Sequence, residues 1–270
     1  SEISQVPIVA GKSISPLNGA HRVAAGLLHN KSISCKKGEE KKDGMLCDYN
    51  YLKSCGLDSY WMDMMALEYA KLKDDTFVVS LFPSCSNTKD EEVREILKES
   101  GEIVYEKDVQ LNKSGGLLYT IEMYQGEPWI GSWNDRFHGA NNKSKLCFTR
   151  EDRPLKVFLM KFPKDEQTLR DIKTRIRSLF DIGNHSVHIN DTHEETVRLC
   201  KLVLNDNSIH FLNNSKFEFI QSFESQIQYF KNFINTNKLN IDDYCITASS
   251  VLSRYGLRPG DDLDYLHRGD

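Results

Sequence analysis

Long apolar runs, basic tracts and closely spaced cysteine pairs are all missing from this 270-residue sequence. No stretch is apolar over the length that a membrane-spanning helix needs, and the first residues show no apolar core of a signal peptide. A net charge of −4, without any concentration of basic residues, argues against nucleic acid as a partner. We therefore expect a protein of the cytoplasm, in the producing cell or its host, that neither enters a membrane nor binds nucleic acid.

The seven cysteines are odd in number and include no C-x-x-C pair, so free thiols are expected rather than a zinc site built from cysteine. Free thiols are typical of a reducing compartment. With 39% hydrophobic and 10% aromatic residues, the composition is that of an ordinary globular protein with a sizeable core. The composition leaves the oligomeric state open.

Two continuous apolar runs, 76–82 and 156–162, have the composition of strands that are buried on both faces. The first run is followed by a helix at 90–100 and a second strand at 103–105. The second run is followed by a helix that begins after Asp165 and by a strand at 186–190. Strands that are joined in this way through a helix pair in parallel. We therefore predict an α/β fold of two small β-α-β-containing units, 1–150 and 151–270, with mainly parallel sheets.

A turn near the N-terminus carries the first candidate site. Gly19 allows a tight turn, and residues 20–28 have the composition of a helix whose first turn contains His21 and Arg22. Backbone N–H groups and the helix dipole attract anions there, and an arginine can clamp a phosphate with two parallel hydrogen bonds. The segment resembles the G-x-H-R motif of the ParB/sulfiredoxin-like superfamily, which implies phosphate binding by Asn18, Gly19, His21 and Arg22. The alternative is an ordinary helix start with a surface arginine.

The segment HSVHINDTHEE, which ends at Glu195, holds three histidines and three carboxylates and could be interpreted as a metal site. However, Thr192 and Glu195 have the spacing of a capping box, which begins a helix. His188 and His193 are not explained in this way, and open α/β sheets bind ligands at the carboxyl ends of parallel strands. We therefore favour contact with substrate or phosphate over metal binding, with His188, Asp191 and His193 as candidate acids or bases.

A tryptophan-rich loop forms the third candidate site. Trp129 and Trp133 are followed by Asp135 and Arg136, a mixture that is typical of sugar-binding surfaces, where rings stack on the sugar and polar groups bind its hydroxyls. We predict that Trp129, Trp133 and Arg136 bind an acceptor and that Asp135 is a further candidate base. The alternative is that the two tryptophans anchor the loop to the core.

The C-terminal segment has the most informative pattern. It predicts a short strand, a turn of small residues with Ser249 and Ser250, a short helix, and a second strand with Asp262 and Asp264. Side chains two apart on a strand point to the same face, and two adjacent carboxylates repel each other unless a cation lies between them. Paired oxygen ligands suit Mg2+ or Mn2+ on substrate phosphates. The alternative is a hairpin with solvated aspartates.

This segment is similar to the nucleotidyltransferase-fold signature, in which a G-[GS] turn is followed by D-x-D. The resemblance places the two serines at a phosphate and the two aspartates at a divalent metal ion. It departs from the signature in two ways. Ala248 and Ser249 stand where the signature has glycine, and only six residues follow Asp264, which leaves no room for the third carboxylate strand of that fold.

The whole chain resembles proteins encoded in bacterial surface-polysaccharide gene clusters and in large DNA viruses that build their own glycans, on segments 18–25, 183–195 and 249–266. This resemblance implies a glycosyltransferase that moves a sugar from a nucleotide-sugar donor to a glycan hydroxyl with the help of Mn2+ or Mg2+. Arg22 and Arg258 would offset the charge of the leaving group. Two alternatives are a nucleotidyl- or phosphotransferase with the same metal pair, which needs a third carboxylate, and a non-catalytic module that binds nucleotide or glycan.

Overall fold

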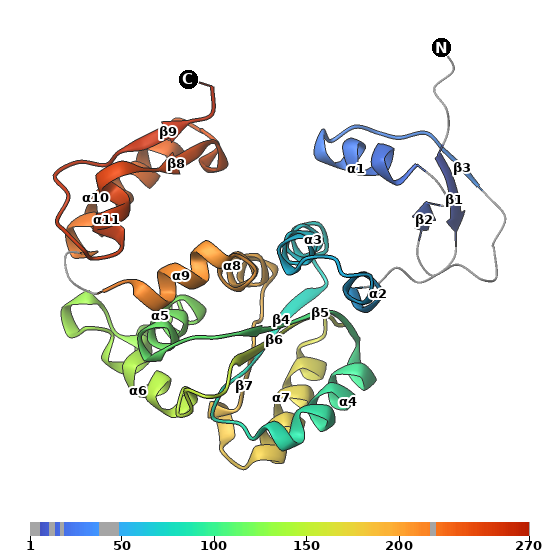
Figure 1. Ribbon diagram of the computed structural model, residues 1–270, viewed down its shortest axis with the longest axis horizontal. Coiled ribbons are helices and arrows are strands. Elements are labelled where there is room, and N and C mark those ends of the chain that lie inside the picture. The colour runs from blue at the N-terminus through green and yellow to red at the C-terminus, as the bar shows by residue number, and fades with distance from the viewer. Residues whose placement is uncertain (1–5, 11–13, 17–18, 38–48, 217–219, 270) are drawn as a thin grey trace. The chain divides into compact units, whose positions relative to one another are not determined.

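The computed structural model describes residues 6–10, 14–16, 19–37, 49–216 and 220–269 (Figure 1). The chain forms two compact units, an N-terminal unit, Ser1–Cys47, and a main unit, Asp48–Asp270. In the N-terminal unit, β1 (Val6–Ala10) pairs antiparallel with β2 (Ile14–Pro16) and parallel with β3 (Cys35–Lys37). Helix α1 (Ala20–Leu28) connects β2 to β3 and spans the residues predicted to be helical.

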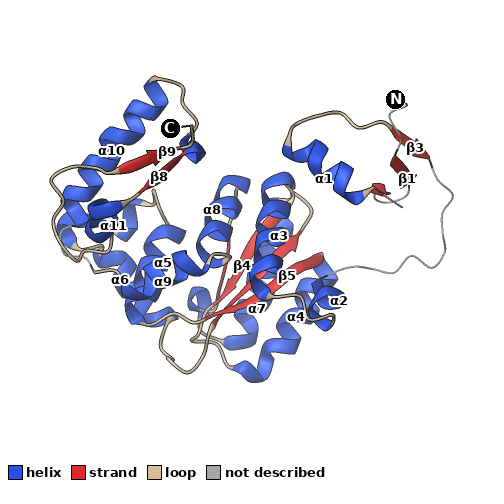
Figure 2. Ribbon diagram, turned by 45° about the horizontal axis from the view of Figure 1, so that its top comes forward, coloured by secondary structure: helices blue, strands red, loops and turns tan. Residues whose placement is uncertain are grey.

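The main unit is built on one four-stranded sheet (Figure 2). Its strands are β4 (Thr76–Leu81), β5 (Glu102–Val109), β6 (Leu155–Lys161) and β7 (Val187–Ile189), in the order β5-β6-β4-β7. Every neighbouring pair in this sheet is antiparallel. The prediction of mainly parallel sheets in an α/β fold is therefore wrong, because the sheet that organises the protein contains no parallel pair.

The error concerns which strands are neighbours and not where the strands lie. Both predicted strand-helix-strand segments exist: α4 (Asp90–Ser100) connects β4 to β5, and α7 (Glu166–Phe180) connects β6 to β7. However, the two segments interleave, so that β6 lies between β4 and β5, and β4 lies between β6 and β7. This is the split β-α-β arrangement of ferredoxin-like folds. Consequently β5 and β6, on opposite sides of residue 150, are hydrogen-bonded neighbours.

Helices cover both faces of the sheet, and each face has its own apolar core. Helices α4 and α7 cover one face, where Val79 and Leu81 of β4 are buried. The other face, with Val78, is covered by α3 (Ser59–Leu72), α5 (Lys113–Met123), α8 (His193–Val203) and α9 (Asp206–Asn214). Successive residues of β4 thus enter different cores, which explains its continuous apolar run.

The connection from β5 to β6 is a long insertion. It contains α5, two short 3-10 turns, η2 (Pro128–Ile130) and η3 (Trp133–Asp135), and helix α6 (His138–Cys147). Inside α5, Gly116 packs directly on an aromatic ring, because a Cβ atom at this position would lie 2.6 Å from Cγ of Phe148. A glycine is therefore required where α5 meets the end of α6.

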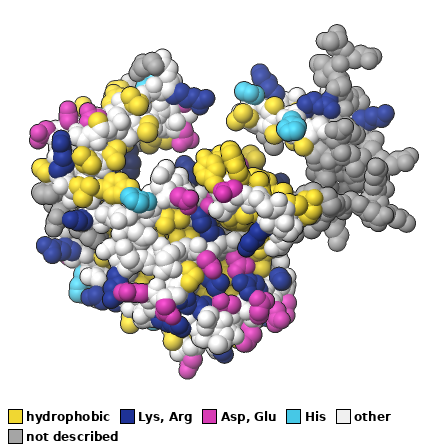
Figure 3. Space-filling view, in the orientation of Figure 1, with side chains coloured by type: hydrophobic (Ala, Val, Ile, Leu, Met, Phe, Trp, Pro, Cys, Tyr) yellow, Lys and Arg dark blue, Asp and Glu magenta, His cyan; other side chains and the backbone are white. Residues whose placement is uncertain are grey.

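The helix before β4 has an unusual surface. Before α3 lies the short α2 (Tyr49–Ser54), and α3 itself contributes Met62 and Ala66 to the core. The opposite side of α3 is also apolar, with exposed side chains of Tyr60, Trp61, Met64, Met65 and Leu72. Figure 3 shows these hydrophobic side chains gathered over α3.

The last part of the main unit, residues 220–269, is called the C-terminal module below. It consists of α10 (Ile220–Thr236), the 3-10 turn η5 (Ile241–Asp243), β8 (Tyr244–Ile246), α11 (Ala248–Arg254) and β9 (Tyr265–His267). Strands β8 and β9 form an antiparallel pair that packs on α10 through the rings of Phe230, Tyr244 and Tyr265. None of the helices in the described parts of the chain is long and apolar enough to cross a bilayer.

Candidate functional site

The C-terminal module contains an aromatic groove of about 600 Å3 between α10 and the loop before β9. Its lining consists of Ser225, Gln226, Tyr229, Phe230, Phe233, Asp261, Asp262, Leu263 and Tyr265. The rings of Phe230 and Tyr265 lie 4.8 Å apart between centroids, and Tyr229 is 78% exposed. Exposed rings can stack on a sugar or a base, and the two aspartates can accept hydrogen bonds from its hydroxyl or amino groups.

The two halves of the predicted C-terminal motif meet beside this groove. The carboxylate of Asp264 accepts hydrogen bonds from the backbone N–H of Ser249 at 3.2 Å and from its hydroxyl at 2.7 Å. The hydroxyl of Ser250 accepts a hydrogen bond from the backbone N–H of Asp264 at 2.7 Å and donates to the carbonyl of Asp262 at 3.4 Å. Both serines, predicted to bind phosphate, are thus engaged with the aspartate loop.

The strand that was predicted to carry Asp262 and Asp264 begins only at Tyr265. The two aspartates therefore lie in the preceding loop, and their side chains are not fixed on one strand face. Among residues 19–37, 49–216 and 220–269, no group of three or more His, Cys, Asp or Glu side chains is placed to hold a metal ion. Two carboxylates suit Mg2+ or Mn2+ chemically, but such an ion would take its other ligands from water or substrate. Arg258, predicted to bind phosphate, is exposed after α11.

The first residue of α11, Ala248, has a backbone conformation that is typical of glycine. Ala248 has a φ of +48°, in the left-handed region that side chains with a Cβ rarely adopt. This is the position at which the nucleotidyltransferase-like signature has glycine. The backbone therefore adopts a conformation suited to glycine although this chain has alanine at the position. This conformation is locally strained.

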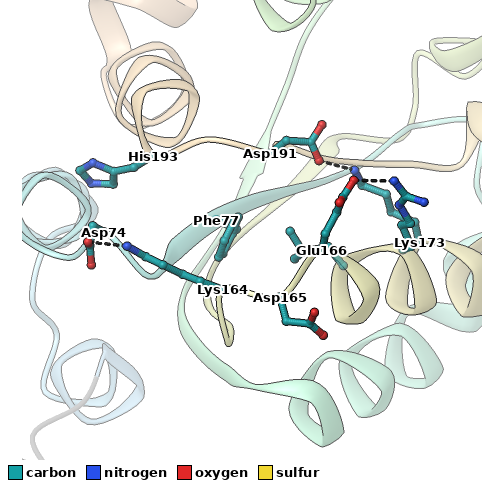
Figure 4. A pocket seen from close by; sticks show the side chains of 10 residues that line it. Asp74, Phe77, Lys164, Asp165, Glu166, Lys173, Asp191 and His193 are labelled. Atoms are coloured by element: carbon teal, nitrogen blue, oxygen red, sulfur yellow. Dashed lines mark hydrogen bonds and ion pairs between the residues drawn. The ribbon is translucent and has the colours of Figure 1, made fainter.

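Asp191 and His193 line a second cavity, of about 620 Å3, between the N-terminal end of α7 and the loop from β7 to α8 (Figure 4). Asp191 forms an ion pair with Lys173 at 2.9 Å, and Nε2 of His193 lies 2.8 Å from the carbonyl oxygen of Ala70. Figure 4 also shows Asp74 directed toward Lys164, and this ion pair lowers the pKa of Asp74. Most charges in this cavity are thus already paired.

The helix start at this cavity was predicted correctly. The hydroxyl of Thr192 accepts from the backbone N–H of Glu195, and the Glu195 carboxylate accepts from the N–H of Thr192, so the capping box is present. However, β7 pairs antiparallel with β4, so the argument from the carboxyl end of a parallel strand does not apply. The roles of Asp191 and His193 stay predictions.

His188 does not line this cavity. Its ring meets that of Tyr124 edge-on at 4.9 Å between centroids, on the face of β7 that points toward α5. Burial, together with the positive charge of Lys173, lowers the pKa of His188 to about 3. The imidazole is therefore neutral at physiological pH and a weak proton acceptor.

The tryptophan-rich loop divides between surface and core. Trp129 is 45% exposed and packs edge-on against Tyr124 at 4.8 Å, whereas Trp133 packs on Phe137 at 4.9 Å. The carboxylate of Asp135 accepts from the backbone N–H groups of Ser132 at 2.8 Å and His138 at 3.4 Å, and these bonds lower its pKa. Asp135 thus serves the local turn. Arg136 is exposed, with a φ of +54°.

In the N-terminal unit, Gly19 has a φ of +86°, and its carbonyl accepts the backbone N–H of Arg22 at 2.9 Å. The predicted tight turn before α1 is therefore present. His21 and Arg22 have exposed side chains in the first turn of the helix. Asn18 lies outside the described residues. The predicted phosphate-binding residues thus belong to two different units of the chain.

The main residues that the sequence interpretation missed are the aromatic side chains of the groove. Tyr229 and Phe233 lie one helical turn apart on α10 and flank the buried Phe230. The available signal was a pair of aromatic residues beside the apolar stripe of an amphipathic helix, in a segment that precedes the aspartate motif. Aromatic residues outside the buried stripe of a helix are candidates for ligand contact.

No protein-family model matches this chain, and none of the curated proteins compared with it matches either. A functional proposal therefore depends on the geometry of the chain's own residues.

Proposed function

We propose that this protein is a cytoplasmic transferase that moves a sugar from a nucleotide-sugar donor to a glycan hydroxyl, and that the donor binds to the C-terminal module. The observation that carries the proposal is the aromatic groove, in which exposed rings lie next to Asp261 and Asp262. The cytoplasmic location is supported by the free thiols of all six cysteines in the described residues.

In this proposal the groove and the loop before β9 have separate tasks. Tyr229 and Phe233 stack on the base or sugar of the donor, while Asp262 and Asp264 hold Mn2+ or Mg2+ on its diphosphate. The metal ion offsets the negative charge of the leaving diphosphate when bound. During transfer, the bond between the anomeric carbon and the diphosphate breaks, the acceptor oxygen bonds to that carbon, and a base takes the acceptor proton.

Thermal unfolding of the full chain tests this proposal. UDP-, GDP-, CMP- and dTDP-sugars are compared with ATP and CTP, each with and without Mn2+. A sugar nucleotide at one hundred times its dissociation constant is expected to stabilise the protein by about 2.7 kcal/mol. Failure of every sugar nucleotide to stabilise the protein, with or without Mn2+, would refute the proposal.

Two variants locate the binding site. Tyr229→Ala removes an exposed ring and is expected to weaken binding by about 1–3 kcal/mol, the usual value of one stacked aromatic contact. Asp262→Asn should abolish the Mn2+-dependent part of the stabilisation. The matched control is Asp242→Asn, an exposed carboxylate of the same module outside the groove. If Asp242→Asn weakens binding as strongly as Asp262→Asn, the metal site is wrongly placed.

A second candidate is nucleotidyl transfer, and one observation favours it. The bond between Ser249 and Asp264 and the glycine-like backbone of Ala248 bring together the serine turn and the aspartates as the signature requires. Against it, the described residues contain no group of three carboxylates that is placed to hold a metal ion. Stabilisation by ATP or CTP, with release of pyrophosphate, would support this reaction. Binding of a sugar nucleotide without any turnover would instead indicate a non-catalytic module.

A further inference from the structure

Three basic side chains gather at the outer edge of β7 without a carboxylate partner. They are Lys143 of α6, Arg177 of α7 and His185 of η4 (Gly183–His185), a 3-10 turn directly before β7. Within the described parts of the chain, neither Lys143 nor Arg177 forms an ion pair with a carboxylate. Positive charge therefore accumulates here without an ion-pairing carboxylate in the described residues.

Lys143 is deeply buried for a lysine, with 8% of its surface exposed. Its ammonium group donates to the carbonyl oxygen of Asn184 at 2.5 Å and lies 3.5 Å from Nδ1 of His185. A carbonyl dipole does not neutralise a full charge, and burial together with the charge of Arg177 lowers the pKa of Lys143. The side chain is held in place, but its charge is not compensated.

Arg177 extends from α7 toward the same place. Its Nε atom is fully buried and has no hydrogen-bond partner. Helices α6 and α7 both pack against η4, and the charge of Arg177 acts on Lys143, Tyr124 and His188. A buried guanidinium N–H without an acceptor is costly, and a bound ligand with acceptor oxygens would remove that cost.

Other buried cations of this protein are treated differently. Arg153, which is 4% exposed, forms an ion pair with Asp90 at 2.6 Å. Lys156 forms an ion pair with Asp108 at 3.0 Å. The carboxylate nearest to the basic cluster in sequence is Asp181, the exposed C-cap residue of α7, which forms no ion pair within the described residues. Asp191, six residues after His185, is engaged by Lys173 at 2.9 Å. Arg153 and Lys156 thus each have a carboxylate partner, whereas Lys143 and Arg177 have none within the described residues. An external anion would compensate their charge.

We propose that Lys143, Arg177 and His185 bind the phosphate group of a small molecule. A guanidinium group presents parallel donors that fit phosphate oxygens, an ammonium group adds a point charge, and a neutral imidazole can donate one further hydrogen bond. This site is separate from the groove in the C-terminal module and does not depend on the function proposed there.

Titration calorimetry on the full chain tests the proposal with inorganic phosphate and, separately, with glucose 1-phosphate, at an ionic strength held constant with chloride. The variants are Lys143→Met and Arg177→Met, and the controls are Lys145→Met and Arg175→Met. These controls change exposed residues of the same two helices, and Arg175 forms an ion pair with Glu99. We expect each site variant to weaken binding at least tenfold and each control to leave it within twofold.

The two probes distinguish the source of the phosphate. The probe that binds with the higher affinity shows whether the site prefers the free anion or a phosphorylated sugar. Thermal unfolding provides a second readout, in which phosphate should stabilise the wild type more than chloride does and should not stabilise the site variants. If Lys143→Met fails to fold, the phosphate affinity of Arg177→Met, compared with that of the wild type, is the test. Equal affinity in wild type and Arg177→Met, or no effect of phosphate beyond that of chloride, overturns the proposal.

Discussion

Replacing Ala248 with glycine is expected to stabilise this protein, although such a change in a helix normally destabilises. Ala248 has a φ of +48°, and a residue with a Cβ in the left-handed region is disfavoured by about 1–2 kcal/mol. Glycine removes that cost but loses more backbone freedom on folding, by roughly 0.5–1 kcal/mol. The Ala248 side chain is exposed, so deletion of its methyl group removes little packing. The net gain in the free energy of unfolding is therefore about 0.5–1 kcal/mol.

Urea unfolding followed by circular dichroism measures this gain, and a thermal midpoint raised by about 1–4 °C should accompany it. The control is Lys231→Gly, on the exposed side of α10, where glycine is expected to cost about 1 kcal/mol. The two substitutions should thus have opposite signs within one module. A loss of stability in Ala248→Gly comparable to that in Lys231→Gly would refute the idea of strain at this turn.

Three further predictions concern the main unit. The pKa of histidine is about 6.5 in the unfolded chain, and the pKa of His188 in the folded protein is about 3. Between these values the unfolded state binds more protons, so the free energy of unfolding falls as the pH drops below 6.5. By pH 5 this loss amounts to about 2 kcal/mol, and urea unfolding at pH 5 and 7.5 should show it in wild type but not in His188→Gln. Gly116→Ala should lower the free energy of unfolding by about 1–3 kcal/mol, because the added methyl group clashes with Phe148. Thermal unfolding measures this loss, and an unchanged midpoint would contradict the close packing. Arg153→Met should lower the free energy of unfolding by about 1.5–3 kcal/mol, because Asp90 loses its nearer partner and keeps only Lys156 at 3.5 Å. Urea unfolding measures this loss, and an unchanged free energy of unfolding would contradict it.

The positions of the helices and strands in the main unit could largely be predicted from the sequence. Residues 76–81 are mostly apolar or β-branched, which predicts a buried strand. The carboxylate of Asp165 accepts from the backbone N–H groups of Gln167 and Thr168 at the start of α7, as its N-cap position predicts. Such signals are local. Strand pairing is not local, because an apolar run that indicates burial on both faces contains no information about which strand lies beside it.

The candidate sites show the same division between local and distant information. The serine turn and the aspartate loop meet through Ser249 and Asp264, which are 15 residues apart and belong to one recognisable pattern. The cluster of Lys143, Arg177 and His185 is brought together from three elements by the fold, and nothing in the sequence near any of them indicates the other two. Only the packing of α6 and α7 against η4 reveals it.

The interleaved strand order has a consequence for how this chain folds during synthesis. Strand β4 leaves the ribosome early, but its partners come much later, since Val78 pairs with Leu159 and Leu81 with Val187. Strand β5 also waits for β6. The growing chain must therefore hold two unpaired strands, one of them the largely apolar β4, until residue 155 and beyond have emerged. This implies high contact order, slow folding and a period of exposure to aggregation.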